Sequence, residues 1–306
     1  MRSAATRGPA ALAWLLTFGL LLAPRAFAAP DRLTLVVDGH SLALWTESAK
    51  TPRATLLLVH GRTWSSLPNF DLAVSGENRS VFDAFMRRGY AVYALDLRGY
   101  GASARDETGW LTPARAVADV RAALDYIAVR HPRIAQRPAL LGYSRGAQIA
   151  AILAQGNSRA ASALVLFGFP PGVRNTTTPA VEKPPRAPTT AAAAAEDFIT
   201  PGAASRALID SYVSAALVAD PVRVDWRDEN QFLFEPAKIT TPTLMIYGVN
   251  DPFRNAASAA FFEALAARDR AYVVLPDSDH AAHVENSARA WIHAIAGFLQ
   301  SPRAKE

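Results

Sequence analysis

Residues 138–147 constrain the fold of this chain more than any other stretch. A short apolar run leads into Gly-Tyr-Ser-Arg-Gly at 142–146, and a sequence of high helix propensity follows at 147–153. A strand, a sharp turn and a helix form the setting in which a serine nucleophile projects from a sheet. The residues two positions before and after Ser144 must then be small, because the turn is strained and backbone segments approach closely. The pattern predicts a nucleophile turn at Ser144, although the motif alone also occurs in ordinary turns.

Apolar strands alternate with helices along most of the chain. The strands are continuous apolar runs, which is typical of strands buried on both faces. The alternation predicts an α/β fold: a mostly parallel central sheet with helices on both faces. We expect an opening hairpin at 31–47, strands at 54–59, 91–95, 162–167, 243–247, 271–275 and before Ser144, and helices at 81–88, 112–130, 255–268 and from Val284 to Leu299.

One segment, 169–235, interrupts this alternation. It contains no strand of the predicted sheet, begins with a stretch rich in proline, threonine and alanine, and offers a helix at 203–219. Long proline-rich segments inside compact domains are either mobile or functional. We interpret 169–235 as a cap insertion over the carboxyl edge of the sheet. For 172–195, a mobile surface loop is an equal alternative.

The first 28 residues have the pattern of an export signal. Arg2 and Arg7 form a basic start, an uncharged apolar run of 14 residues follows, and Ala-Phe-Ala at 26–28 has the small-x-small form of a cleavage site. A membrane-spanning helix needs about 20 apolar residues. We therefore expect 1–28 to be a signal peptide and 29–306 to be the mature α/β domain, periplasmic or secreted, without a stable membrane anchor.

Composition excludes several classes of function. The chain has 32 basic and 27 acidic residues, and loss of the three arginines in the expected signal peptide reduces the net charge to about +2. With no run of Lys and Arg, this charge predicts no nucleic-acid partner. The absence of cysteine excludes thiolate metal sites, a cysteine nucleophile and a lipid-modified cysteine.

Two further polar residues follow predicted strands. Asp251 comes after the strand at 243–247, and His280 comes after the strand at 271–275. Catalytic groups of open α/β sheets gather at the carboxyl ends of the strands. A serine hydroxyl needs an imidazole to accept its proton, and the imidazole needs a carboxylate to fix its tautomer. The chain order serine, aspartate, histidine therefore predicts a triad of Ser144, Asp251 and His280.

In combination these motifs resemble α/β-hydrolase-fold enzymes of the serine esterase, lipase and aminopeptidase-like group. The resemblance covers about 54–168 and 236–300, and is carried by His-Gly at 60–61, Asp-Leu-Arg-Gly-Tyr-Gly-Ala-Ser at 96–103, the serine turn, Gly-x-x-Asp at 248–251 and the late histidine.

The resemblance also implies an oxyanion hole formed by two backbone N–H groups. One is that of Arg145, and the other lies in the turn after residues 60–61, most simply at Arg62. The sequence lacks the glycine-rich version of that turn, so Thr63 is an alternative donor.

Other polar residues have structural interpretations. We expect His60 to hold the oxyanion turn rather than to act as a base, because the base is placed elsewhere. His283 competes with His280 but is expected inside the final helix. Asp277 and Asp279 lie near His280, where loop and cap roles are as plausible as a catalytic one.

The resemblance favours a hydrolase that cleaves carboxylic esters of small molecules through an acyl-enzyme on Ser144, with no metal or organic cofactor; the oligomeric state stays open.

A proline-iminopeptidase-like exopeptidase is an alternative, for which the cap should present acids to an amine: Glu196, Asp197, Asp228 and Glu229. An acyltransferase or perhydrolase is another, if water is excluded from the acyl-enzyme. The complete triad argues against a non-catalytic binding module.

The cleavage motif makes a direct prediction: the mature N-terminus is Ala29. It follows from Ala-Phe-Ala at 26–28 behind the apolar run. Intact-mass measurement on the exported protein checks it, and a mass that still includes residues 1–28 would indicate an uncleaved anchor instead.

Overall fold

The computed structural model describes residues 29–172 and 183–301. The predicted signal peptide lies outside these residues, and so does part of the proline-rich stretch. Within the two described ranges, no helix combines the length and the apolar composition needed to cross a bilayer.

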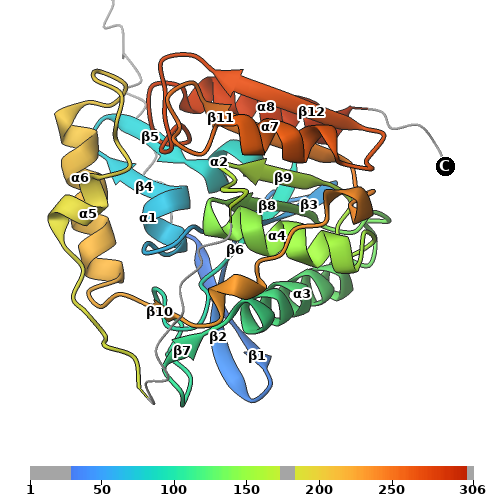
Figure 1. Cartoon of the computed structure of the whole chain (residues 1–306), viewed down its shortest axis with the longest axis horizontal. Coiled ribbons are helices and arrows are strands. Elements are labelled where there is room, and N and C mark those ends of the chain that lie inside the picture. The colour runs from blue at the N-terminus through green and yellow to red at the C-terminus, as the bar shows by residue number, and fades with distance from the viewer. Residues whose placement is uncertain (1–28, 173–182, 302–306) are drawn as a thin grey trace, which may run out of the picture.

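A single eight-stranded sheet forms the centre of the molecule (Figure 1). The strand order is β1-β2-β6-β3-β8-β9-β11-β12; β1, β2 and β6 pair antiparallel, and the other neighbours pair parallel. The prediction of a mostly parallel sheet is confirmed. The strands are β1 (Asp31–Val37), β2 (His40–Ser48), β3 (Ala54–Val59), β6 (Tyr90–Leu95), β8 (Ala139–Tyr143), β9 (Leu164–Phe167), β11 (Thr243–Gly248) and β12 (Arg270–Leu275).

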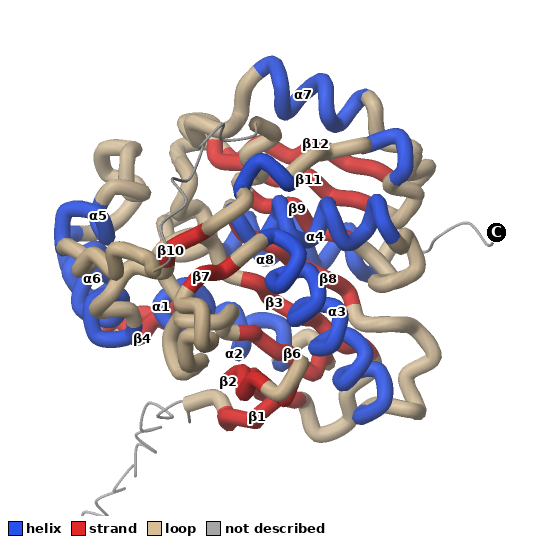
Figure 2. Tube along the Cα trace, turned by 60° about the horizontal axis from the view of Figure 1, so that its bottom comes forward, coloured by secondary structure: helices blue, strands red, loops and turns tan. Residues whose placement is uncertain are grey.

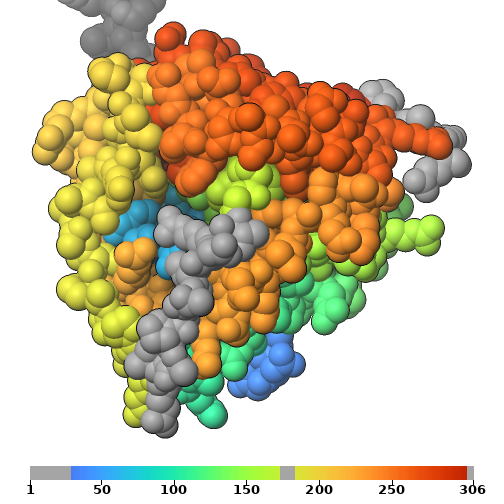
Figure 3. All heavy atoms as spheres, in the orientation of Figure 1, coloured from blue at the N-terminus to red at the C-terminus, as the bar shows by residue number. Residues whose placement is uncertain are grey.

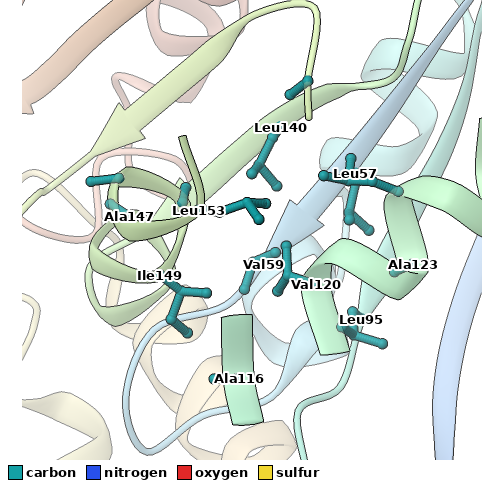
Figure 4. Close-up of a cluster of buried hydrophobic side chains, with 14 of the residues drawn as sticks. Leu57, Val59, Leu95, Ala116, Val120, Ala123, Leu140, Ala147, Ile149 and Leu153 are labelled. Carbon is teal, nitrogen blue, oxygen red and sulfur yellow. The ribbon is translucent and has the colours of Figure 1, made fainter. Parts of the chain in front are cut away.

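Helices cover both faces of this sheet. Successive side chains of a strand point to opposite faces, so Leu57 and Val59 pack into one core cluster and Leu56 and Leu58 into another. This double burial explains why the strands are apolar throughout rather than alternating. The first face carries α3 (Pro113–Arg130), α4 (Arg145–Gly156) and α7 (Ala256–Glu263), and the second carries α2 (Val81–Met86) and α8 (Ala288–Gln300). Figure 4 shows side chains of β3, β8, α3 and α4 meeting on the first face.

Local signals fix some helix ends, but tertiary contacts fix others. Thr112 caps α3 as predicted, with its hydroxyl accepting from the N–H of Arg115. The prediction for the last helix was wrong at its start, because α8 begins at Ala288 rather than at Val284. The N–H of Asn286 donates instead to the carbonyl of Ala203 at 2.8 Å, outside the helix, so residues 284–287 do not form the regular helical hydrogen-bond pattern.

A third layer lies beside the sheet and includes most of the predicted cap; we call residues 183–235 the cap segment. Helices α5 (Ala191–Ala195) and α6 (Arg206–Ala219) stand to one side in Figures 1 and 2, next to α1 (Ser66–Phe70) and the hairpin of β4 (Asp71–Val74) and β5 (Glu77–Ser80). Their shared core is Trp64, Leu72, Val74, Ala194, Leu208, Tyr212, Ala216, Ala281 and Val284. The cap segment adds no strand to the large sheet. Its β10 (Asp225–Trp226) pairs instead with β7 (Trp110–Leu111), and the short helices η1 (Glu229–Gln231) and η2 (Pro236–Lys238) lead back to the sheet.

Candidate active site

Ser144 occupies a strained turn between β8 and α4. Its φ of 52° and ψ of −111° lie in a region that a residue with a side chain rarely adopts, at a typical cost of about 1–3 kcal/mol. The flanking glycines make the turn possible. A β-carbon at Gly142 would lie 2.3 Å from the carbonyl oxygen of Gly146, and one at Gly146 would lie 2.2 Å from that of Val59. Both glycines of the motif are therefore required by packing.

The turn after β3 presses against this serine. A β-carbon at Gly61 would lie 3.1 Å from Cβ of Ser144. His60 holds the turn from behind: Nε2 accepts from the N–H of Leu97 at 3.1 Å, and Nδ1 donates to the carbonyl of Gly61 at 2.8 Å. Burial lowers the pKa of His60, so the imidazole is neutral and both nitrogens serve the backbone. These bonds match the structural role expected for His60.

Asp251 and His280 meet at the ends of two neighbouring strands. β11 and β12 pair in parallel, so the loops that follow them emerge at the same edge of the sheet. Nδ1 of His280 bonds to Oδ2 of Asp251 at 2.9 Å, and both side chains are buried. The other carboxylate oxygen accepts from the N–H of Phe253 at 2.9 Å, which fixes the carboxylate in place.

The charge state of His280 reflects two opposing effects. Burial, the largest single effect, lowers the pKa of the imidazole, but the hydrogen-bonded carboxylate of Asp251 together with the charges of Asp197 and Asp279 raises it by more. The net pKa lies above the ordinary value. This arrangement stabilises an imidazolium, the species that forms when a histidine accepts a proton from a serine hydroxyl.

Gly168, directly after β9, is a site residue that the sequence analysis missed. Its φ is +57°, and a β-carbon there would lie 2.6 Å from Cε1 of His280 and 3.1 Å from Oδ2 of Asp251. Only glycine leaves room for this pair. A glycine at the end of a predicted strand was the available signal, but nothing in the sequence connects it to a histidine 112 residues later.

The other polar residues near His280 are engaged elsewhere. Asp279 accepts from the backbone N–H groups of Ile199 and Thr200 in the cap segment, at 2.8 and 2.5 Å, and Asp277 is exposed. Burial, together with Asp279 beside it, raises the pKa of Glu285 to about 8, so that carboxyl is protonated at neutral pH.

His283 lies in a turn rather than in the predicted helix. Its ring packs against Tyr143, Phe167 and Trp291, and burial lowers its pKa to about 3. It is therefore a neutral core side chain and does not compete with His280.

Ser144 and His280 line one cavity of about 460 Å³. The surface in Figure 3 is hollowed between the yellow cap segment and the orange-red C-terminal part of the chain. Because the cap segment forms one wall, its side chains face whatever occupies the cavity. Other lining residues include Gly61, Arg62, Thr63, Trp64, Tyr143, Thr190, Glu196, Asp197, Arg223 and Phe253.

The candidate oxyanion residues flank Ser144 from two sides. Arg145 is the first residue of α4, so its N–H lies in the helix turn whose donors have no carbonyl partner within the helix. Arg62 follows Gly61 in the turn beside the serine. Arg62 and Thr63 both line the cavity that contains Ser144.

A family model described as "Serine aminopeptidase, S33" matches residues 50–287. The chain belongs to the serine aminopeptidase S33 family. Its fold is that of the α/β hydrolases and its enzyme class is that of the serine hydrolases, so these two predictions are confirmed. No curated protein sequence matches the chain.

Solved structures share the architecture of this S33-family chain. A thermophilic esterase from Thermogutta terrifontis has a TM-score of 0.63 and 17% identity, covering 88% of this chain and 98% of the esterase. The thioesterase domain from the curacin biosynthetic pathway has a TM-score of 0.62 and 19% identity, covering 88% and 100%. A serine hydrolase involved in carbazole degradation has a TM-score of 0.62 and 20% identity, covering 89% and 99%. At these identities the likeness shows the fold alone.

The contacts of the three aspartates predict different effects on catalysis. Asp251→Asn should reduce kcat by about 10⁴-fold, because the amide favours the wrong imidazole tautomer. The carboxylate of Asp251 raises the pKa of His280, so its removal should lower that pKa. The residual kcat/KM of Asp251→Asn should therefore begin to fall at a lower pH than that of the parent enzyme. Asp277→Asn and Asp279→Asn should each cost less than about tenfold. Steady-state pH profiles check this; an active Asp251→Asn beside an inactive Asp279→Asn would mean that the acid is misassigned.

Proposed function

We propose that this protein hydrolyses carboxylic esters through an acyl-enzyme on Ser144, with His280 as general base and Asp251 as the orienting carboxylate. One observation carries the proposal. A serine held at positive φ shares a cavity with a buried histidine whose far nitrogen bonds to a buried carboxylate at 2.9 Å. This arrangement supplies the parts that activation of a weak nucleophile requires.

Each residue then has one chemical task. Oγ of Ser144 attacks the ester carbonyl carbon while Nε2 of His280 accepts its proton. The backbone N–H groups of Arg62 and Arg145 donate to the oxyanion of the tetrahedral intermediate. The intermediate collapses, the alcohol leaves with the proton from His280, and the acyl group stays on the serine. Water, deprotonated by His280, repeats the sequence and releases the carboxylic acid.

Export belongs to the same proposal. It rests on the signal-peptide pattern of residues 1–28, and hydrolysis of small esters outside the cytoplasm requires no cofactor supplied there. The apolar ring of Trp64 and that of Phe253 in the cavity wall fit an acyl or alcohol group of modest size.

Removal of a free N-terminal residue is the second candidate, and the cavity wall favours it. Glu196 and Asp197 line the cavity, and Asp197 forms no ion pair with any described residue, so its carboxylate is available to an amine. Burial raises the pKa of Asp197, and a bound ammonium group would reverse that shift. Of the other acids considered, Glu229 binds two arginines and Asp228 is half-exposed beside Arg227.

Replacement of the nucleophile tests the chemistry common to both candidates. Ser144→Ala should lose about 10⁴-fold or more in kcat, because no other described group at the site can form the acyl-enzyme. The fold should persist, since alanine is smaller and the glycines that permit the turn are unchanged. Turnover is measured on p-nitrophenyl esters with freshly purified protein. Activity within tenfold of the parent would contradict the assignment of Ser144.

A parallel panel separates the two substrate classes. Hydrolysis of p-nitrophenyl esters without release from aminoacyl-nitroanilides supports the esterase. If nitroanilides are cleaved and Asp197→Asn raises their KM about tenfold or more while leaving esters unchanged, the exopeptidase is the correct function.

A further inference from the structure

Glu229 of the cap segment joins the two residues proposed to form the oxyanion hole. Its carboxylate is buried and accepts from Nη1 of Arg62 at 3.0 and 2.8 Å. The same carboxylate accepts from Nη2 of Arg145. One acid therefore holds two guanidinium groups, although Arg62 and Arg145 are far apart in the sequence and belong to different elements.

Aromatic rings hold this cluster from the other side. Cζ of Arg145 lies 4.6 Å from the ring centroid of Phe232 and 5.0 Å from that of Trp226, distances typical of cation–π contacts. Nε1 of Trp226 donates to the hydroxyl of Tyr100 at 2.9 Å, and the Tyr100 ring lies 4.5 Å from the ring of His60. The cluster thus connects the cap segment to both turns that face Ser144.

An oxyanion hole depends on the relative position of two backbone donors. Each N–H must lie about 2.7–3.1 Å from the oxygen of the tetrahedral intermediate, and loss of one donor costs about 10²–10³ in kcat. Here one donor lies on a loop after β3 and the other at the start of α4. The backbones of these two segments already approach closely at Gly61 and Gly146, and the Glu229 carboxylate adds a bridge between the side chains of Arg62 and Arg145.

We propose that Glu229 is a positioning residue that sets the spacing of the Arg62 and Arg145 backbone amides and thereby the strength of the oxyanion hole. This inference rests on the proposed acyl-enzyme function. The carboxylate offsets the repulsion between the two guanidinium groups and holds them together. The cap segment therefore contributes to the chemical step as well as to the cavity wall.

The test replaces Glu229 by Gln, which keeps the shape and removes the charge that binds two arginines. We expect kcat for a p-nitrophenyl ester to fall about 10- to 100-fold, less than the loss of a whole donor, while KM changes less than about threefold. A trifluoromethyl ketone, which forms a tetrahedral oxyanion on the serine, should lose affinity by the same factor as kcat/KM. Glu229→Asp, which keeps the charge, should recover part of the loss.

Asp119 provides a matched control for the general effect of breaking a buried ion pair. It lies on α3 and binds Arg98, in the loop after β6, through two bonds of 2.9 and 2.8 Å, and this pair is at least as buried as the Glu229 cluster. Asp119→Asn should lower Tm while kcat stays within about twofold of the parent. Comparable losses of kcat in Asp119→Asn and Glu229→Gln would overturn the proposal, because they would indicate a general effect on the fold.

Two further results separate this inference from the proposed function. If Ser144→Ala is inactive but Glu229→Gln keeps full kcat and full ketone affinity, only the positioning role is wrong. If Ser144→Ala is active, the proposed function itself fails. Should Glu229→Gln not accumulate as folded protein, Glu229→Asp is measured with the same ester and ketone, and unchanged values again overturn the proposal.

Discussion

The rest of the site depends on the backbone of Ser144 being held at positive φ. That conformation is unfavourable for a residue with a side chain and persists only where the surrounding packing determines it. Here the packing is the contact of Gly142 and Gly146 with backbone atoms of α4 and β3, close enough to exclude even a methyl group. The core clusters on both faces of the sheet keep β3, β8 and α4 together, so burial of apolar side chains provides the energy that holds the turn.

Carboxylates attach the loops around this turn by accepting backbone N–H groups. Asp96 accepts from the N–H groups of Ser66 and Ala102 at 2.9 and 3.0 Å. Asp220, at the end of α6, accepts from Ser65 and Gly101 at 2.7 and 2.8 Å, and burial raises its pKa to about 6. Asp220 and Asp279 thus attach the cap segment to the loops that follow β3, β6 and β12. The site is therefore assembled from loops that carboxylates hold in fixed relative positions.

Much of the fold followed from local pattern. Apolar runs indicated strands buried on both faces, Thr112-Pro113 indicated the start of α3, and the spacing of glycines indicated the serine turn. The site followed less completely. Asp251 and His280 could be proposed because both follow strands, whereas the roles of Gly168 and Glu229 could not. Glu229 even suggested an amine-binding acid, but the structure shows its carboxylate bound to Arg62 and Arg145.

The sequence by itself determined the order and the type of the elements and the positions where a serine, a histidine and an aspartate could meet. These properties depend on a few neighbouring residues, such as an apolar run, a glycine two positions from a serine, or a polar residue at a strand end. Only the tertiary structure decided which carboxylate serves which partner. Asp251 binds the histidine, Asp279 binds the cap segment, and Glu229 binds two arginines. All three are acids in loops, and such partnerships join residues distant in sequence, so they depend on how the loops pack together and leave no local pattern.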